Sequence, residues 1–277
     1  MKKQTKILFI SQEIDPYVNE TELAMLCRKV PQYAQDHGTE IRVFMPCYGQ
    51  INERRNQLHE VQRLSGVNII IDDNDHPQIM KVASIPTIRV QVYFIDNDDY
   101  FQRKGIWRDA AGQPFEDNDE RSMFFVRGVL ETIKRMRWTP DIILCSGWIT
   151  ALAPMYIKQS YYTEPFISHA KVVYSICQER ISSPLHEGVG SRLMFDGLKS
   201  EDWAEMEGKD ELTSDLMDRM ALRYADAAIA ETEEVPECVM ELIRERELPF
   251  LDYSDSTPGE RHYRFFEQIC PAFSDEE

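Results

Sequence analysis

Long hydrophobic runs and an excess of positive charge are both missing from this sequence of 277 residues. No stretch approaches the roughly 20 consecutive apolar residues that a membrane-spanning helix requires. The 48 acidic residues outnumber the 31 Lys and Arg, and the formal net charge is −17. Nucleic acids and anionic bilayers attract proteins through basic surfaces. We therefore expect neither nucleic acid nor a membrane as a partner, and the N-terminal segment, too short for a signal peptide, favours a cytoplasmic location.

Paired cysteines and clustered histidines are also missing. The six cysteines are dispersed without a C-x-x-C pair, and the six histidines show no H-E-x-x-H or comparable spacing. Two acidic segments, at residues 72–75 and 96–99, lack the sixth-position glycine and the distal glutamate of a calcium-binding loop, so we interpret them as solvated turns. The sequence therefore predicts reduced cysteines, no metal site and no cofactor.

What the sequence does contain is a strand, loop, helix and strand near its N-terminus. Residues 7–10 form a short apolar run that ends in a polar loop, as buried parallel strands do. Apolar residues then recur at helical spacing from Leu23, Gly38 ends that helix, and residues 41–45 form a second apolar strand. In parallel α/β sheets, ligands bind where strand carboxyl ends meet helix N-termini. We therefore expect the functional site at residues 12–22.

The alternation of strands and helices continues along the chain. With 43% hydrophobic and 10% aromatic residues, the sequence can fill a packed core. We expect Asn118 to cap a helix, residues 188–208 to be a loop-rich insertion and residues 249–258 to be a linker. The predicted strands cover residues 67–71, 78–83, 88–95, 141–145, 170–176 and 224–230, and the predicted helices cover 120–135, 150–161, 212–224, 235–246 and 260–269.

Several sequence blocks follow one another in the order found in a known enzyme family. The first block keeps Glu13, Pro16, Tyr17, Leu23, Ala24, Arg42, Val43, Pro46, Tyr48 and Gly49. Later blocks are residues 92–97, 118–125, 140–152 and 224–226. Together they resemble the bacterial glycogen synthases and plant starch synthases of glycosyltransferase family 5. The resemblance implies an α/β fold with a Rossmann-like parallel sheet flanked by helices, like the N-terminal domain of a two-domain GT-B glycosyltransferase.

The first loop has lost the residues that carry the family's chemistry. Asn19 stands where the family has its donor-phosphate lysine, Thr21 and Glu22 replace its two glycines, and Met25 replaces the following aspartate. A diphosphate at a helix N-terminus needs small residues for close approach and a cation nearby, and this loop provides neither. We interpret it as an ordinary helix start, with Asn19 or Thr21 as the cap.

Two further positions have changed in the later blocks. The family's His-Asp pair is Ser146-Gly147 here, and its donor-sugar histidine is Cys177. Glycine supplies no side-chain acceptor for a charged transition state, and a thiol nucleophile needs a neighbouring base or cation. We therefore assign no catalytic residue and treat Asn19, Met25, Gly147 and Cys177 as degenerate positions.

The resemblance also predicts how the chain is divided. Residues 1–232 correspond to the starch/glycogen synthase N-terminal domain, and we predict a helical tail over residues 233–277. In the family, a second domain supplies the donor-binding arginine, lysine and glutamate. We expect that domain to be absent from this chain.

The first functional hypothesis is a non-catalytic relative that binds α-1,4-glucan or a protein of glycogen metabolism. Surface aromatic residues, among them Trp107 and Trp203, would stack on sugars, and burial in the core is the alternative use of such rings. The candidate substrate-binding residues are Glu13, Tyr17, Trp148 and Thr150.

The second hypothesis follows from the usual activity of the family. The chain would be a glucosyltransferase that moves glucose from ADP-glucose or UDP-glucose to an α-1,4-glucan, with the donor half supplied by another chain. A third hypothesis is that the missing domain leaves the C-terminal edge of the sheet as a protein interface, either for a homo-oligomer, most simply a homodimer, or for a separate donor-domain protein.

Overall fold

One ten-stranded sheet organises the computed structural model, which describes residues 4–18, 21–195, 197–254 and 256–273. Its parallel part contains, in spatial order, β12 (Phe250–Leu251), β11 (Ala227–Ala230), β8 (Lys171–Ile176), β7 (Ile142–Ser146), β1 (Lys6–Ser11), β2 (Glu40–Pro46) and β6 (Gln91–Asp96). The antiparallel part contains β5 (Asn74–Ser84), β3 (His59–Glu60) and β4 (Val67–Ile71). Strand β5 pairs with β6 on one side and with β3 on the other, and β4 also pairs with β5.

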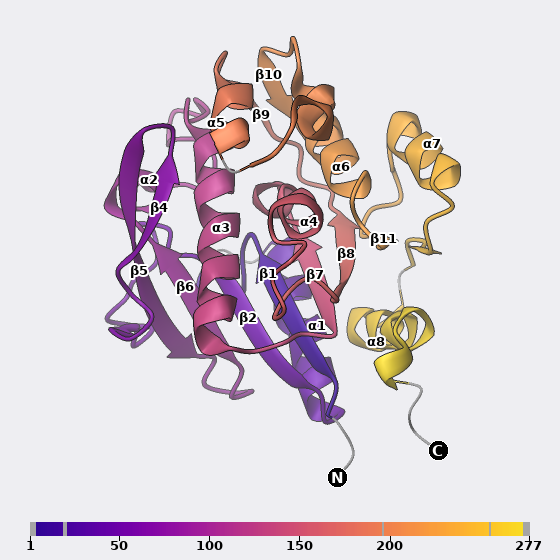
Figure 1. The fold of residues 1–277 in the computed structure, drawn as a ribbon. Helices are drawn as coiled ribbons and strands as arrows, with labels where there is room; N and C mark the ends of the chain where they lie inside the picture. The colour runs from indigo at the N-terminus through magenta and orange to yellow at the C-terminus, as the bar shows by residue number, and fades with distance from the viewer. Residues whose placement is uncertain (1–3, 19–20, 196, 255, 274–277) are drawn as a thin grey trace.

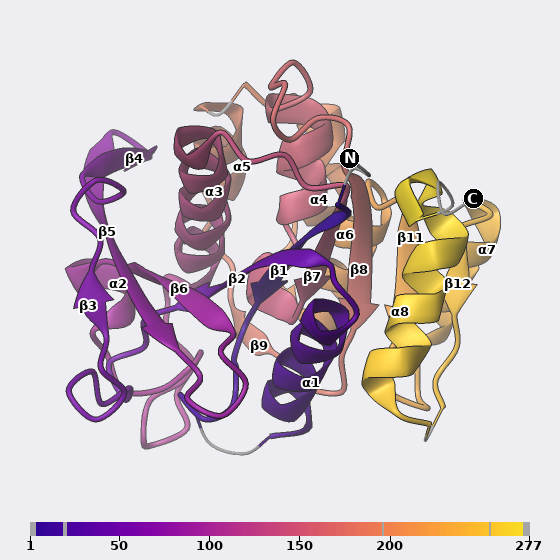
Figure 2. The same cartoon turned by 90° about the horizontal axis from the view of Figure 1, so that it is seen from below.

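Helices cover both faces of this sheet. In Figure 2, α3 (Asn118–Met136) and α4 (Ala153–Met155) lie on one side, and α1 (Glu22–Asp36) and α8 (Pro258–Ile269) lie on the other. The remaining elements, several of which are labelled in Figure 1, are α2 (Asp98–Phe101), η1 (Trp148–Thr150), η2 (Tyr156–Ser160), β9 (Ser182–Pro184), α5 (Val189–Phe195), η3 (Ser200–Met206), β10 (Glu211–Thr213), α6 (Ser214–Leu222), α7 (Glu237–Glu245) and η4 (Pro271–Phe273). The predicted α/β fold, with a Rossmann-like parallel sheet flanked by helices, is confirmed.

Strand β1 lies at the centre of the parallel part. Ile7 aligns with Ile41 of β2 on one side and with Ile142 of β7 on the other. Five of its six residues are buried, as expected for a strand that helices cover on both faces. Because β1 is held from both sides, the loop that follows Ser11 leaves the sheet at a defined place.

Helix α1 begins and ends as the sequence predicts. Thr21 is the N-cap, and its Oγ1 accepts a hydrogen bond from the Ala24 N–H at 2.9 Å. Gly38 follows the helix with a φ of +84°, a conformation that favours glycine, and the chain then enters β2. The alternative cap, Asn19, lies outside the described residues.

Two predictions about local structure are wrong. Asn118 does not cap α3, because Asp117 occupies the cap position. The Asn118 side chain instead donates to the Trp107 carbonyl at 2.8 Å and accepts from Arg121 at 2.7 Å, within a buried network. The segment 188–208 is not loop-rich, since its described residues include α5 and η3.

Two further segments also differ from the prediction. The helix expected over 150–161 is divided into η1, α4 and the π-helical η2, with Pro154 in the first turn of α4. Proline has no backbone N–H to donate, so it fits a first turn and not a helix interior. The expected linker 249–258 contains β12, which pairs in parallel with β11. The C-terminal segment therefore joins the sheet.

Helix α8 packs against α1 at very short range. A Cβ added to Gly259 would lie 2.6 Å from the Tyr33 Cβ, closer than Cβ atoms approach one another in proteins. The Tyr263 ring meets the Tyr33 ring edge-on at 5.8 Å, and Phe266 is fully buried. The last long helix is thus part of the domain core.

We expect Gly259→Ala to lower the free energy of unfolding by about 1–3 kcal/mol, because the added methyl forces α8 away from Tyr33. Urea denaturation followed by circular dichroism measures this. Gln268→Ala, at an exposed position of the same helix, is the matched control and should change stability by less than about 0.5 kcal/mol. Equal stability of the two variants would contradict the close packing of α8 on α1.

Candidate functional site

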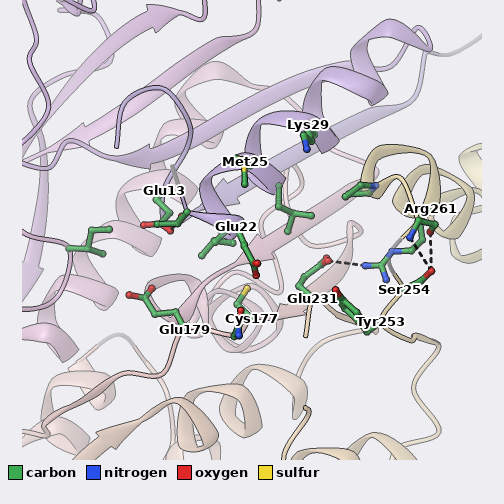
Figure 3. A pocket seen from close by; sticks show the side chains of 17 residues that line it. Glu13, Glu22, Met25, Lys29, Cys177, Glu179, Glu231, Tyr253, Ser254 and Arg261 are labelled. Carbon is green, nitrogen blue, oxygen red and sulfur yellow. Dashed lines mark hydrogen bonds and ion pairs between the residues drawn. The ribbon is translucent and has the colours of Figure 1, made fainter. Parts of the chain in front are cut away.

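A cavity of about 530 Å³ lies where the carboxyl ends of β1, β8 and β11 meet the N-terminus of α1. This is the place that the sequence predicts for a ligand. Figure 3 shows side chains from α1, from the segments that follow the three strands and from the C-terminal segment around it. The lining residues are Glu13, Thr21, Glu22, Leu23, Met25, Leu26, Lys29, Ile106, Cys177, Gln178, Glu179, Glu231, Tyr253, Ser254, Ser256, Pro258 and Arg261.

Acidic side chains dominate the charge of this cavity. Four of its described lining residues are glutamates, at positions 13, 22, 179 and 231, against Lys29 and Arg261. Arg261 is already committed, because its guanidinium forms an ion pair with Glu231 at 2.8 Å. The cavity therefore carries a negative field, in agreement with the acidic composition of the whole chain.

Glu13 is the most deeply buried of these carboxyl groups, with 2% of its surface exposed. Its Oε1 accepts a hydrogen bond from the Thr21 hydroxyl, while its Oε2 is buried without a partner in the described structure. Burial removes water from the charged form and raises the pKa of Glu13 to about 7. Near neutral pH this carboxyl therefore exists in both protonation states.

Glu179 is held in place by two donors. The Trp107 indole N–H donates to its Oε1 at 2.9 Å, and the Gln12 side-chain amide donates to its Oε2. Gln12 directly follows β1, so the end of the central strand positions a carboxylate that follows β8. The negative charge of Glu179 also contributes to the raised pKa of Glu13. No sequence pattern predicts this pairing, because Gln12 and Glu179 are far apart along the chain.

Gly147 contacts the same glutamine. Its φ is +94°, and an added Cβ would lie 2.5 Å from the Gln12 Cβ. Gln12 therefore fills the space that a side chain at position 147 would need. A residue with a carboxylate cannot be placed there without moving Gln12 away from Glu179.

Cys177 lines the cavity but is not activated. The residue is 8% exposed, and its thiol donates a hydrogen bond to the Ser175 carbonyl at 3.4 Å. Burial raises the pKa of the Cys177 thiol well above its usual value, and the nearby carboxylate of Glu231 raises it further. The thiol stays protonated at physiological pH, which is the wrong state for a nucleophile.

The structure brings only some of the candidate residues together. Glu13, Met25 and Cys177 line this cavity, and Gly147 lies behind Gln12. Asn19 lies outside the described residues. Tyr17 lines a separate cavity of about 750 Å³, whose lining also includes the amide side chains of residues 50, 52, 56 and 57.

Of the two uses considered for the aromatic rings, exposure on the surface is wrong for Tyr17, Trp107 and Trp148, which are buried in the core. Trp148, Trp107 and Tyr17 are 4%, 9% and 5% exposed, and Trp203 is partly buried over Gly190. The Tyr17 ring packs edge-on against Phe94 at 4.8 Å. Burying a large ring releases more free energy than leaving it in water for a ligand, so these side chains serve the core.

Thr150, the last candidate substrate-binding residue, is also buried. Its hydroxyl donates to the Gly147 carbonyl at 2.7 Å, which closes the first turn of η1. Thr150 therefore shapes the backbone behind Gln12 and does not line the cavity.

One group of potential metal ligands lies away from the cavity. The ligand atoms of Cys47, Glu53 and Asp96 lie within 4.8 Å of one another. The Lys81 ammonium, however, lies 2.6 Å from a carboxylate oxygen of Glu53 and 2.6 Å from one of Asp96. A divalent cation would have to displace this ammonium, so the cluster is best described as a lysine-centred ion-pair network.

In the part of the chain that the structure describes, no helix has the length and apolar character needed to cross a bilayer.

Comparison with known sequences decides the family. A profile of the starch synthase catalytic domain matches residues 6–235. The chain belongs to this family. The glycogen synthase of Chlorobium limicola is 37% identical over 176 residues, which are 63% of this chain and 36% of that protein. The glycogen synthase of Chlorobium phaeovibrioides is 36% identical over 201 residues, 72% of this chain and 41% of that protein.

A solved structure confirms the fold of this family member. The catalytic domain of starch synthase IV from Arabidopsis thaliana, bound to ADP and acarbose, matches with a TM-score of 0.71 at 14% identity. The match covers 93% of this chain and 53% of that one. The chain thus spans less than half the length of the curated relatives and about half of the solved structure.

The raised pKa of Glu13 predicts a specific pH dependence of stability. Between about pH 4.5 and pH 7, the folded state keeps a proton on Glu13 that the unfolded state has released. Stability therefore falls as pH rises through this window. Glu13→Gln has a neutral side chain at every pH and does not show this loss. The free energy of unfolding of the variant should therefore rise relative to that of wild type by on the order of 3 kcal/mol as pH increases from 5 to 8.

Urea unfolding of both proteins at pH 5, 6, 7 and 8 measures this difference. Asp218, whose pKa burial also raises to about 7, is present in both proteins, so its contribution cancels. A stability difference that does not vary with pH would show that Glu13 is ionised in the folded state throughout.

Proposed function

We propose that this chain binds α-1,4-glucan in the acidic cavity and does not transfer glucose by itself. One observation carries the proposal. Four glutamates line the cavity at the strand and helix ends, and one of its two basic side chains is already paired with a glutamate.

This electrostatic environment opposes a nucleotide diphosphate. Binding such a group requires free backbone N–H donors, close approach and positive charge. The Thr21 side chain already uses the Ala24 N–H at the start of α1, and Glu22 adds a negative charge in the first turn. Lys29 is the remaining basic residue of the described lining, and it is exposed. The donor of the usual family reaction would therefore meet four glutamates and one exposed lysine at this place.

The same environment suits a neutral sugar. Sugar hydroxyls donate hydrogen bonds, and carboxylates accept them more strongly than neutral oxygens do. The buried Oε2 of Glu13 has no partner in the described structure, so a ligand hydroxyl would satisfy an acceptor that is costly to leave unpaired. A cavity of about 530 Å³ is in the size range of small-molecule sites.

The choice of sugar follows from the family. The matched relatives are named glycogen synthases, and the solved starch synthase IV domain is bound to ADP and acarbose. Glycogen synthases build α-1,4-glucans, as the sequence resemblance implies. The alternative function is glucose transfer with a donor half from another chain. It predicts incorporation of labelled glucose in the first experiment below.

The purified chain should co-sediment with glycogen and should incorporate no labelled glucose from ADP-glucose or UDP-glucose, because the donor phosphates meet negative charge. Both assays use the same preparation at high protein concentration. Incorporation above a heat-denatured blank would favour the transferase alternative, and absence of co-sedimentation would remove the glucan-binding proposal.

Glu179→Gln should weaken glycogen binding about tenfold, because it removes a charged acceptor that Trp107 and Gln12 hold in place. Co-sedimentation over a range of glycogen concentrations gives the apparent affinities. Glu267→Gln removes the same charge from an exposed position of α8 and should leave binding unchanged. Equal weakening of both variants would mean that overall charge, and not this cavity, governs binding.

A further inference from the structure

One wall of the cavity comes from a part of the chain that the family match does not reach. The match ends at residue 235, yet Tyr253, Ser254 and Ser256 line the cavity together with residues that follow β1, β8 and β11. In Figure 3, Tyr253 and Ser254 lie at one end of the group of side chains, and Glu13 lies towards the other. The described lining therefore has acidic groups along its length and hydroxyl groups at this end.

Tyr253 is the aromatic residue of this lining. The described lining residues contain no other Tyr, Phe or Trp, and the Tyr253 side chain is partly exposed. It differs in this respect from Tyr17, Trp107 and Trp148, whose rings are buried in the core. The C-terminal segment thus provides a partly exposed aromatic ring of the kind that was expected of the tryptophans.

A buried ion-pair network fixes this wall to the end of β11. Arg261 donates to the Asp252 carbonyl at 2.9 Å, to the Ala230 carbonyl at 3.2 Å and to the Glu231 carboxylate at 2.8 Å. His262, which is fully buried, forms a hydrogen bond with the other oxygen of Glu231. Because Arg261 binds the residue directly before Tyr253, the backbone that carries the ring is held against the parallel sheet.

We infer that Tyr253 is a sugar-binding residue, on whose face a glucose ring of the glucan packs while the Ser254 and Ser256 hydroxyls bind its rim. The inference rests on the proposed binding of α-1,4-glucan. Sugar rings present C–H groups on their faces and hydroxyls around their edges. An aromatic face buries the first, and carboxylates and hydroxyls pair with the second. The cavity supplies both kinds of contact from two distant parts of the chain.

The position of Tyr253 also gives this site a specificity of its own. Residues 6–235 provide the acidic groups on the family frame, whereas the aromatic contact depends on a segment outside that match. Two points of contact separated along the cavity favour a chain of linked glucose units over a single glucose. We expect a linear maltooligosaccharide to bind more tightly than glucose does.

Titration calorimetry with maltoheptaose tests the inference. Tyr253→Ala should weaken binding about fivefold to thirtyfold, because it removes the packing surface, whereas Tyr253→Phe keeps the ring and should bind within about twofold of wild type. Tyr162→Ala removes a ring that is 67% exposed and does not line the cavity, and it should bind like wild type. A Tyr253→Trp variant adds a direct signal, since its fluorescence should shift when maltoheptaose is added.

The outcomes separate the two proposals. If wild type binds maltoheptaose and Tyr253→Ala binds equally well, the assignment of Tyr253 is wrong while the proposed function stands. If wild type does not bind, the proposed function fails and this inference fails with it. Circular dichroism spectra and urea midpoints of all four variants identify any loss that comes from unfolding.

Discussion

The burial of β1 between β2 and β7 is the constraint on which the rest of the site depends. A parallel strand covered on both faces must be apolar along its length, so its polar residues begin only where it leaves the sheet. In this chain the polar residues that follow the apolar run of β1 are Ser11, its last residue, and then Gln12 and Glu13. The strand delivers them into contact with the ends of its neighbours, and all three are almost completely removed from water. The chemistry of the cavity, including the raised pKa of Glu13, follows from that desolvation.

The frame of the family and the charge of its cleft are separate properties in this chain. Apolar side chains on seven parallel strands set the frame, and a relative with 14% identity keeps it. A few residues after each strand set the charge, and here they are largely glutamates. A fold held by its core can therefore carry a different set of ligands without any rearrangement of the sheet. The negative field of the cavity therefore comes from the residues that follow the strands, and the architecture of the sheet does not determine it.

Local sequence patterns correctly predicted the elements that depend on interactions between residues close together along the chain. The apolar run at residues 7–10, the cap at Thr21 and the stop at Gly38 each depend on neighbours along the chain, and the structure confirms the strand, helix and strand. The prediction of one helix over 150–161 was wrong because Pro154 interrupts the helical hydrogen bonding. Asn118 looked like a helix cap, but Arg121 and the Trp107 carbonyl offered its amide better partners.

The candidate site was predictable in position but not in composition. Parallel topology places ligands at strand carboxyl ends, so Glu13 could be located from the sequence alone. The pairing of Gln12 with Glu179, and of Glu231 with Arg261, depends on long-range packing that one sequence does not reveal. Tryptophans that suggested a sugar surface are buried, since a periodic pattern cannot distinguish a ring that faces water from one that faces the core.

The contact between Gly147 and Gln12 makes two positions of the chain interdependent. Gly147 has a backbone conformation that disfavours other residues, and its missing side chain leaves the room that Gln12 occupies. Gln12 in turn holds Glu179. Restoring the family's aspartate at position 147 would strain the backbone, expel the glutamine and release the carboxylate. A side chain at position 147 would thus be accommodated only together with a change at Gln12, so the effects of substitutions at these two positions are not independent.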